Sequence, residues 1–320
     1  MKKLFLVAAF LTAAAGCRSN LFLGQVEGVA ATAVSPHGHV PLFAANVAIE
    51  GVAPDATDYR AETLTSAAGG FGFPAVPDGR YRLDLASGNG LFVATYYVDV
   101  LDEHSPGEME IAMRPAHAAT FVVVPGWYDD MGLLFSALGY QYRTLDVGNL
   151  AVVPNPLADA DIVCLNSGAD TAWADNPVVI GNLREFVAGG GRLLVSDRAW
   201  PFIKAAWPNA AAWGGNPEVG TGDQNIVASF ADGELRRCVT IPEWRLRYDL
   251  GGWALPATTT GTVWVRGDAA TSGGTRADAP LLFSFKEGDG VVTFATFGWR
   301  TELADGRVPV RVFNYLAANI

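Results

Sequence analysis

The hydrophobic pattern of this chain changes its period once, near residue 118, and that change predicts two structural units. Residues 22–114 consist of short alternating runs such as RYRLDLAS, separated by Gly, Pro and Asp clusters typical of turns. Continuous apolar runs such as FVVV and DIVCL follow, and they alternate with amphipathic segments. Short alternating strands indicate an all-β sandwich, whereas apolar strands alternating with helices indicate a parallel sheet covered on both faces. We therefore expect a multi-domain chain with an all-β N-terminal unit and an α/β C-terminal unit.

The second unit, residues 115–320, has the alternation expected of a three-layer α/β fold. NPVVIGNLREFVAGGG has the pattern of a helix, with Asn176 as N-cap and Pro177 at its first position. RLLVSD follows as a buried strand. A segment rich in Gly, Thr and Trp, at about 207–275, interrupts the pattern and predicts a β-rich insertion with a small core of its own. The pattern then resumes in a hairpin that turns at 286–290.

Residues 1–16 have the features of a secretory leader of the lipoprotein type. Two lysines precede an apolar run that is too short to span a bilayer. The following AAGC resembles a bacterial lipobox, which implies that Cys17 becomes a lipidated N-terminus, that residues 17–21 form a tether, and that acyl chains such as palmitate anchor the protein. Arg18 in place of Asp, by resemblance to Gram-negative lipoproteins, favours the outer membrane. An ordinary cleaved leader with a chance cysteine is the alternative.

The N-terminal unit resembles the carboxypeptidase regulatory-like domain, a transthyretin-like β-sandwich. The shared pattern is Pro-Leu-x-x-Ala-x-Val, then a Gly-x-Phe hairpin, then Pro-x-Gly-x-Tyr, here Pro41, Leu42, Ala45, Val47, Gly70, Phe71, Phe73, Pro77, Gly79 and Tyr81. We expect Gly70 and Gly79 to adopt positive φ in tight turns. We expect Phe71, Phe73 and Tyr81 to point into the sandwich core. The resemblance implies a non-catalytic accessory module.

The C-terminal unit resembles the class I glutamine amidotransferase-like fold, of flavodoxin-like topology. The similar stretches are DAD, LREFVAGGGRLLV and GVVTFATF, and they are mostly structural. Members of that family use Cys, His and Glu, with the nucleophile at a sharp turn after a central strand. The turn at that place here is Ser196-Asp197-Arg198, which contains no cysteine. The resemblance therefore implies a degenerate domain that keeps the shape of the catalytic turn without its nucleophile.

The histidines also argue against a catalytic triad in the second unit. All four precede residue 118, at His37, His39, His104 and His117. Neither a Cys-His nor a Ser-His pair can therefore form within 118–320. Lys204 is eight residues from Ser196, which is the wrong spacing for a direct hydrogen bond, and the Gly-x-Ser-x-Gly elbow is missing. We expect no catalytic residues, although an enzyme remains open.

Residues at the carboxyl ends of the expected strands predict a ligand cleft, because ligands of open α/β sheets bind there. These candidate cleft residues are Trp127, Asp129, Asn166, Ser167, Ser196, Asp197, Arg198, Trp299 and Arg300. The alternative is that Asp197 caps the next helix and pairs with Arg198 or Arg300. All nine tryptophans lie in the second unit, where they predict either a recognition surface or the core of the insertion.

Metal and disulfide chemistry have little support in the sequence. No His/Cys cluster has zinc spacing, and Asp129 and Asp130 suit the first turn of a helix, where the dipole favours acidic groups. We expect no metal and no cofactor. Cys164 lies in an apolar run and is expected to be a buried free thiol, although an oxidising compartment would permit a disulfide with Cys238.

Composition excludes two classes of protein and leaves the function as a choice among three hypotheses. Half of the residues are apolar and the net charge is −11, which argues against disorder and against nucleic-acid binding. We expect a bacterial surface or periplasmic lipoprotein that binds or scaffolds, with the membrane and an envelope protein or glycan as partners, and the face of the membrane stays open. The second hypothesis is a hydrolase-type enzyme that uses Asp197, Asp129 and Glu302 with an unseen metal or cofactor. A purely structural envelope component is the third, and the oligomeric state stays open.

Overall fold

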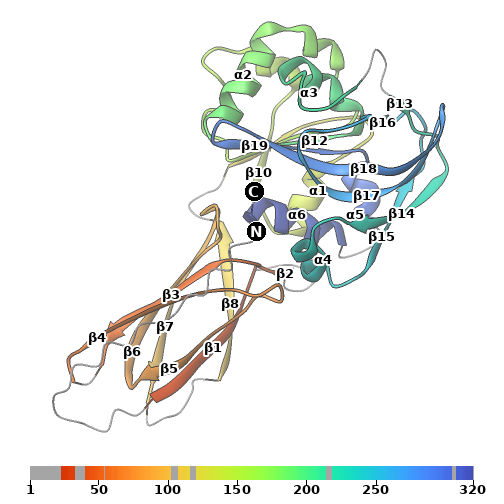
Figure 1. Ribbon diagram of the computed structural model, residues 1–320. Coiled ribbons are helices and arrows are strands. Elements are labelled where there is room, and N and C mark those ends of the chain that lie inside the picture. The colour runs from red at the N-terminus through yellow and green to blue at the C-terminus, as the bar shows by residue number, and fades with distance from the viewer. Residues whose placement is uncertain are drawn as a thin grey trace.

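The structure is a computed structural model, and it describes residues 23–32, 40–53, 55–101, 107–115, 120–213, 218–304 and 308–319. The expected leader with Cys17 and Arg18 lies outside the described residues, as do all four histidines. The described residues are rich in β structure and form two large sheets, with helices beside the second (Figure 1). No helix in this part of the chain is long and apolar enough to cross a membrane.

The N-terminal sheet has eight strands in the order β2-β1-β8-β7-β6-β3-β4, and β5 pairs with β1. Its pairs are antiparallel except β1 with β8, which run parallel. Only two residue pairs join β7 to β8, so the sheet turns there into two layers (Figure 1). The strands are β1 Leu23–Thr32, β2 Val40–Pro41, β3 Asn46–Val52, β4 Asp58–Leu64, β5 Gly70–Pro77, β6 Gly79–Ala86, β7 Phe92–Val100 and β8 Glu108–Pro115.

Alternation along these strands directs one side-chain row into the core, as the sequence predicts. Phe71, Phe73 and Tyr81 are all buried. The turn before β5 differs from expectation, because Gly69, with φ 79°, takes the positive-φ position that we expected at Gly70. Gly79 adopts φ 150°, as expected. The positive φ belongs at Gly69 because that residue closes the turn before the extended strand begins.

The second sheet has nine strands in the order β10-β9-β11-β12-β19-β18-β17-β14-β15. Its first five strands are parallel and the rest antiparallel. Counted along the chain, the parallel strands have the order 2-1-3-4-5, a common doubly wound arrangement. The strands are β9 Phe121–Val124, β10 Tyr142–Thr144, β11 Ile162–Leu165, β12 Arg192–Ser196, β14 Gln224–Phe230, β15 Glu243–Tyr248, β17 Thr262–Thr271, β18 Gly274–Glu287 and β19 Gly290–Ala295.

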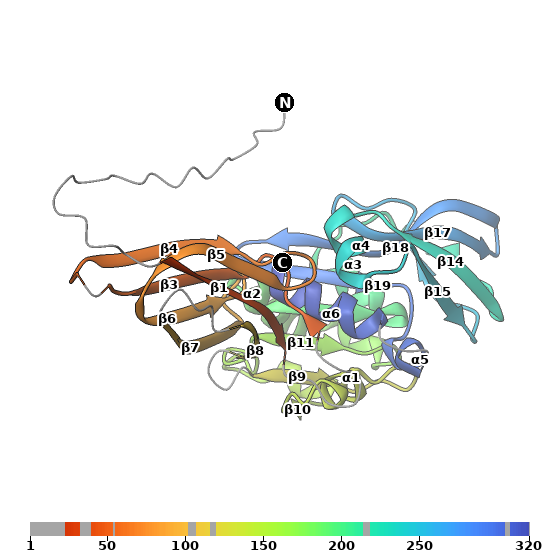
Figure 2. The ribbon, with the colours of Figure 1, turned by 90° about the horizontal axis from the view of Figure 1, so that it is seen from below.

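Helices cover both faces of this sheet, because its central strands are apolar on both sides. Val122 and Val124 pack with α2 and α3, whereas Phe121 and Val123 pack with α1 and α6 (Figure 2). Asn176 caps α2, as predicted, by accepting from two backbone amides. The helices are α1 Met131–Ala137, α2 Pro177–Ala188, α3 Trp200–Ala206, α4 Gly233–Val239, α5 Trp299–Ala304 and α6 Val308–Asn319, with short 3-10 turns η1 Val147–Ala151, η2 Thr171–Asp175 and η3 Asp197–Ala199.

The segment at about 207–275 is rich in strands, as predicted, but it does not form a separate unit with its own core, and that part of the expectation is wrong. Strands β14, β15 and β17 extend the main sheet on its antiparallel side. Trp244 and Trp253 lie in the same buried cluster as Phe121. A small two-stranded sheet, β13 Glu218–Val219 with β16 Ala254–Leu255, stands beside it. Strand β17 pairs with β18, β14 with β17, and β15 with β14. The segment therefore shares the core of the main sheet and needs no second one.

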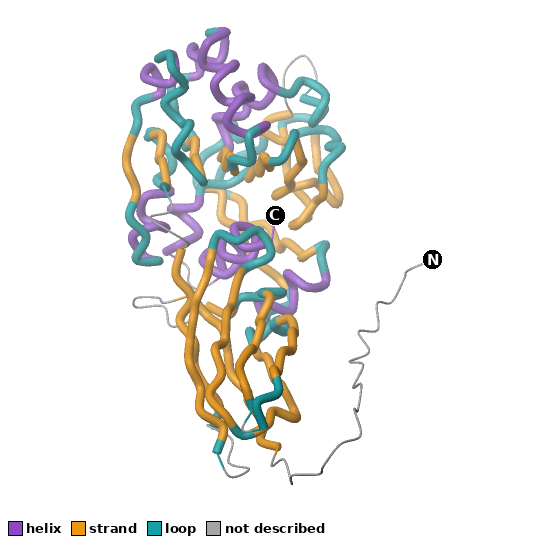
Figure 3. Tube along the Cα trace, turned by 90° about the vertical axis from the view of Figure 1, so that its left-hand side faces the viewer, coloured by secondary structure: helices purple, strands orange, loops and turns teal. Residues whose placement is uncertain are grey.

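The two sheets share one continuous buried cluster through α6. Phe43 stacks on Tyr315 with ring centroids 5.8 Å apart, and Phe92 packs on Tyr140 at the same separation. The Asn89 side-chain amide donates to the Ala317 carbonyl. Figure 3 shows the N-terminal strands ending against the helix that closes the chain. These contacts hold the N-terminal sheet directly against the helical layer.

The two cysteines in the described part of the chain are buried and unpaired. Burial raises the pKa of Cys164 well above its usual value and that of Cys238 to about 11. Both therefore behave as small apolar residues, as expected for Cys164.

Candidate functional site

A small cleft opens at the carboxyl ends of the parallel strands, where the sequence predicts a ligand site. Its volume is about 150 Å³. The walls come from the loops after β9, β11, β12 and β19, and from the segment that follows β15. We call this the carboxyl-edge cleft; it is lined by Trp127, Tyr128, Ser167, Asp197, Arg198, Arg247, Tyr248, Asp249, Leu250, Trp253, Thr296, Phe297, Gly298, Arg300 and Thr301.

Asp197 occupies the sharp turn between β12 and α3, with a φ of 40°. It does not cap the following helix, so the capping part of the alternative drawn from the sequence is wrong, whereas the expected pairing with Arg198 is present. Instead Oδ2 accepts from the Ser167 hydroxyl (3.1 Å) and Oδ1 accepts from the Ala254 amide (3.1 Å). The Arg198 guanidinium lies 4.0 Å from its carboxylate. The carboxylate therefore joins the turn to the segment that returns across the cleft.

Burial raises the pKa of Asp197 to about 6. The bonds from Ala254 and Ser167 and the charge of Arg198 act in the opposite direction, while the nearby Asp129 raises the value further. Desolvation has the largest effect on the pKa of Asp197, because the charged form loses water on nearly every side. Asp197 is thus partly protonated near pH 6, unlike an ordinary carboxylate.

Ser196 is not arranged as a nucleophile. Its Oγ is buried and accepts from the Ser167 amide (2.9 Å). Lys204 lies over the Trp200 ring, 5.5 Å from its centroid, and no hydrogen bond connects it to Ser196. The sharp turn after β12 therefore places a carboxylate, and not a nucleophilic hydroxyl, at its tip.

Asp129 is fully buried behind the cleft and does not stand in the first turn of α1. Asp130 is the N-cap of that helix, so the dipole explanation applies to it instead. Asp129 Oδ1 accepts from the amides of Asp130 (2.8 Å) and Arg300 (2.9 Å). Its Oδ2 makes no hydrogen bond of ordinary geometry. Burial raises the pKa of Asp129, and the bonds from Arg300 and from the nearby Ser196 hydroxyl lower it in part.

Three arginines line the cleft, and two of them have partners. Arg198 lies over the Tyr128 ring at 4.5 Å and donates to the Gly251 carbonyl (2.5 Å). Arg247 pairs with Asp249 at 2.6 Å. The exposed side chain of Arg300 makes no ion pair or hydrogen bond with the residues that the structure describes. Among the described residues, the cleft therefore presents one cation without a counterion.

The structure brings five of the nine candidate residues to the cleft wall: Trp127, Ser167, Asp197, Arg198 and Arg300. The other four, Asp129, Asn166, Ser196 and Trp299, are buried beneath it. Trp299 lies in the core because α5 begins at that residue and turns the ring inward against Phe313.

The sequence analysis did not predict the wall formed by the end of β15 and the segment after it, which includes Tyr248, Leu250 and Trp253. The Gly-, Thr- and Trp-rich segment predicts β structure but not that the end of β15 returns to the parallel edge. Six of the nine tryptophans are buried, and Trp127 alone among the described ones is largely exposed, at 87%. The tryptophans therefore serve mainly as core, and the recognition hypothesis rests on Trp127.

Glu302, the third carboxylate of the enzyme hypothesis, lies outside the cleft. It is fully buried, and its two oxygens accept from the Trp244 indole (3.1 Å) and the Arg247 amide (2.9 Å). Glu302 therefore joins α5 to β15. Within the described ranges, no three His, Cys, Asp or Glu side chains cluster in a way that could hold a metal ion.

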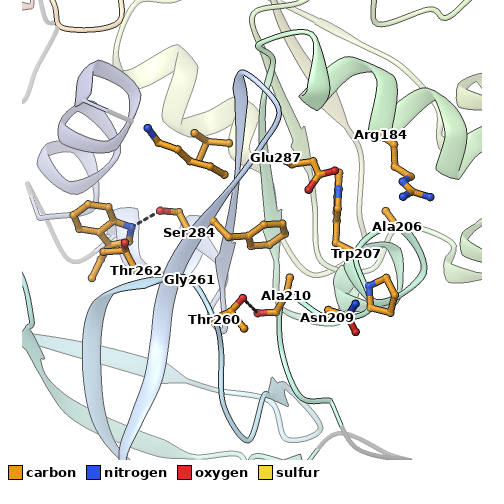
Figure 4. A pocket seen from close by; sticks show the side chains of 15 residues that line it. Arg184, Ala206, Trp207, Asn209, Ala210, Thr260, Gly261, Thr262, Ser284 and Glu287 are labelled. Atoms are coloured by element: carbon orange, nitrogen blue, oxygen red, sulfur yellow. Dashed lines mark hydrogen bonds between the residues drawn. The ribbon is translucent and has the colours of Figure 1, made fainter.

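A larger cavity, of about 670 Å³, lies at the opposite edge of the sheet (Figure 4). Trp207, Phe285 and Glu287 stand on one side of it, and Trp264 and Ser284 on the other. No residue predicted from the sequence as part of a site lines this cavity.

Comparisons with known proteins give only distant likenesses. No family model matches the sequence, and no curated protein matches it. A protein described as a GMP synthase subunit, from Thermoplasma acidophilum, is 12% identical, with 63% of this chain and 94% of that chain covered and a TM-score of 0.43. A cytoplasmic protein of Salmonella typhimurium LT2 is 14% identical, with 62% and 98% covered and a TM-score of 0.44.

A cold-adapted β-galactosidase from Rahnella sp. R3 is 13% identical, with 62% of this chain covered and a TM-score of 0.41. The match covers only 31% of that enzyme. With TM-scores below 0.5, none of these neighbours supports a function for this chain. The strand order itself remains the basis for describing the α/β sheet.

Proposed function

We propose that the chain is a non-catalytic binding module whose carboxyl-edge cleft takes an acidic group of an envelope glycan. The observation that carries the proposal is the Arg300 side chain, which lines the cleft and has no ion-pair or hydrogen-bond partner in the described part of the chain. Three arginines face two carboxylates, Asp197 and Asp249, so the cleft has a positive excess within a chain of net charge −11. A local field of this sign favours an anionic ligand.

The size and the aromatic rim of the cleft support a sugar rather than a large molecule. A cavity of about 150 Å³ is small against the roughly 300–1,000 Å³ of drug-sized sites. It therefore suits one sugar unit at the end of a longer chain. The exposed Trp127 and half-exposed Tyr128 offer flat faces on which a ring can pack. Carboxylate recognition by arginine would then provide the specificity.

Binding of trigalacturonic acid, compared with its methyl ester, tests this proposal. The ester removes the charge and keeps the sugar rings. We expect the acid to bind and Arg300→Gln to weaken it about 10- to 100-fold, the cost of losing a charged hydrogen bond. Arg236→Gln is the matched control, because Arg236 is exposed on α4 and does not line the cleft. Equal binding of acid and ester would count against the proposal.

The pH dependence provides a second readout. The sugar carboxylates stay ionised at pH 5, because ordinary carboxyl groups titrate near pH 4. Asp197 loses its charge as the pH falls through about 6, which leaves three arginines against Asp249 alone. Binding of the acid should therefore strengthen between pH 7 and pH 5 in the wild type. The same change should be much smaller in Asp197→Asn.

A carboxylate-based hydrolase is the second candidate, and the raised pKa of Asp197 within a cleft favours it. Its weakness is that Asp129 lies behind the wall and both oxygens of Glu302 are occupied. Hydrolysis of nitrophenyl glycosides and esters would distinguish the two. Turnover that disappears in Asp197→Asn would favour the enzyme, whereas binding without turnover favours the module.

We propose further that Cys17 carries a lipid anchor that holds the module at the outer membrane. The support is the leader and lipobox-like sequence alone. Intact-mass measurement of the membrane fraction should show an acylated N-terminal cysteine, and Cys17→Ser should release the protein. An unmodified, cleaved protein in the soluble fraction would instead indicate an ordinary leader.

The finer fold assignments belong to this proposal as well. The buried aromatic residues of β5 and β6 support a transthyretin-like, carboxypeptidase regulatory-like N-terminal domain over about 22–114. The 2-1-3-4-5 strand order supports a flavodoxin-like, degenerate amidotransferase-like domain over about 115–320.

A further inference from the structure

The carboxyl-edge cleft is too small for more than the end of a glycan, so the rest of a longer chain must leave it across the protein surface. Its volume is about 150 Å³. One wall is the end of β15, the strand at the outer edge of the second sheet (Figure 1). Strand β15 runs from Glu243 toward the cleft and reaches it at Arg247. Its side chains therefore form a row that leads away from the cleft.

One face of β14 and β15 is open to solvent. Trp244, Leu246 and Tyr248 of β15 are buried in the core, so the side chains between them point to the other face. The residues on that face are all exposed and pair across the two strands as Arg247 with Asn225, Arg245 with Val227, and Glu243 with Ser229. We call this the β15 face. A chain that leaves the cleft along it meets Arg247 and then Arg245.

Arg245 is the second cation outward from the cleft. It lies two residues before Arg247, about 6.7 Å along the strand and on the same face. Arg247 is paired with Asp249 at 2.6 Å. The Arg245 side chain makes no ion pair or hydrogen bond with any residue in the described part of the chain. Its charge is therefore available to an anion on the β15 face, and the planar guanidinium suits a carboxylate.

Val227 supplies an apolar contact beside this charge. It lies opposite Arg245 on β14, and its side chain is 52% exposed. Side chains paired in this way across two strands lie about 4.5–5.5 Å apart at their Cβ atoms. One sugar ring can therefore pack its C–H groups on Val227 while its carboxylate bonds Arg245.

The side of the cleft at β11 carries charge of the opposite sign. The loop after β11 continues into η2, where Asp170 and Asp175 are exposed. Like charges repel, so an acidic chain that leaves the cleft toward η2 is disfavoured. The β15 face is thus the more favourable of these two exits.

We propose, building on the proposed function, that the ligand is a glycan with acidic groups on successive units and that its chain continues from the cleft onto the β15 face. The terminal acidic unit occupies the cleft beside Arg300. A following unit places its carboxylate on Arg245 and its ring on Val227. Glu243 ends the row with a charge of the ligand's own sign, so the site takes the end of the chain rather than its middle.

Calorimetric titration of the full chain with galacturonic acid and with trigalacturonic acid tests this proposal. The single sugar can fill the cleft alone, whereas the trimer also reaches Arg245. We expect the trimer to bind the wild type at least about tenfold more tightly, because its second contact becomes intramolecular. That gain exceeds the roughly threefold statistical advantage of three acidic units. Arg245→Gln should remove most of the gain and leave the affinity for galacturonic acid unchanged.

Two further variants separate a charge contact from a change in folding. Arg245→Glu should bind the trimer more weakly than Arg245→Gln, because it places a like charge on the β15 face. Arg236→Gln on α4 is the matched control and should bind both acids as the wild type does. All three variants should keep the melting temperature of the wild type, since Arg236 and Arg245 are exposed.

The outcomes distinguish this site from the proposed function. Equal affinities for the two acids, or an unchanged trimer affinity in Arg245→Gln, would overturn the continuation onto the β15 face. The cleft itself would still stand when Arg300→Gln weakens the binding of both acids. Failure of both acids to bind the wild type would overturn the two proposals together.

Discussion

The substitution Asp197→Asn should stabilise the protein at neutral pH and have little effect at acidic pH. Burial raises the pKa of Asp197 from the ordinary 3.8 to about 6. When the pKa of a carboxyl group is higher in the folded than in the unfolded state, its neutral form stabilises the fold. This contribution to the free energy of unfolding is complete below pH 4 and disappears as the pH rises through 6. Asparagine has a similar shape, can still accept from the Ala254 amide, and has no charge to desolvate.

The magnitude follows from the difference between the two pKa values. About two pKa units at about 1.4 kcal/mol each amount to roughly 3 kcal/mol lost by the wild type between pH 4 and pH 8. The ion pair with Arg198, at 4.0 Å, offsets little of this. The unfolding free energy of Asp197→Asn should therefore exceed that of the wild type by up to about 3 kcal/mol at pH 8. Near pH 4 the two should coincide.

Urea unfolding at several pH values between 4 and 8 measures this difference directly. Asp249→Asn is the matched control, since Asp249 lines the same cleft in a half-exposed ion pair with Arg247. Such a pair contributes less than about 1 kcal/mol, so the control should follow the wild type closely. A difference for Asp197→Asn that stays flat with pH, or that shows a less stable variant at pH 8, would refute the assignment of a strained, desolvated carboxylate.

Three further predictions concern packing. Gly220→Ala should destabilise the protein strongly, because a Cβ there would lie 1.7 Å from the Trp253 ring. In Gly181→Ala, within α2, the added Cβ meets nothing within 4 Å. That variant should be more stable by about 0.5–1 kcal/mol in thermal unfolding. Phe92→Ala should cost about 3–5 kcal/mol and lower one shared melting transition, since Phe92 packs on Tyr140, which lies between α1 and β10 of the C-terminal unit. Two separate transitions in calorimetry would contradict this. Glu302→Gln should cost about 1–3 kcal/mol by urea unfolding, because its amide would oppose a buried donor.

Local patterns were sufficient to predict most of the strands. The alternation around Phe71 and Tyr81 shows which side chains point inward, because the strand period is two wherever one face is buried. The cap at Asn176 likewise depends on neighbouring residues only. The position of positive φ at Gly69 rather than Gly70 shows the usual limit, since pattern reasoning cannot distinguish adjacent glycines of one turn.

The part of the candidate site that lies at the carboxyl ends of the parallel strands could be predicted from the sequence. The part formed by a segment that returns to the cleft from the antiparallel side of the sheet could not. Ser167, Asp197 and Arg300 each follow a parallel strand and reach the cleft. Tyr248 ends an antiparallel strand and Trp253 follows it, and no local signal determines the register of that strand. The burial of Asp129 could not be predicted from the sequence either, because it depends on the Arg300 amide, 171 residues away in sequence.

The properties of Asp197 together argue that the turn after β12 serves a function beyond folding. A non-glycine residue at φ 40° is strained, and a buried carboxylate with a pKa of about 6 opposes folding at neutral pH. Glycine would relieve the first cost and asparagine the second. Two bonded partners, Ser167 and Ala254, hold the carboxylate in place and offset these costs. Strain and a shifted pKa meeting in one cleft are typical of a binding or reactive site. They support the proposal of an acidic ligand beside Arg300, whose side chain makes no ion pair with the residues that the structure describes.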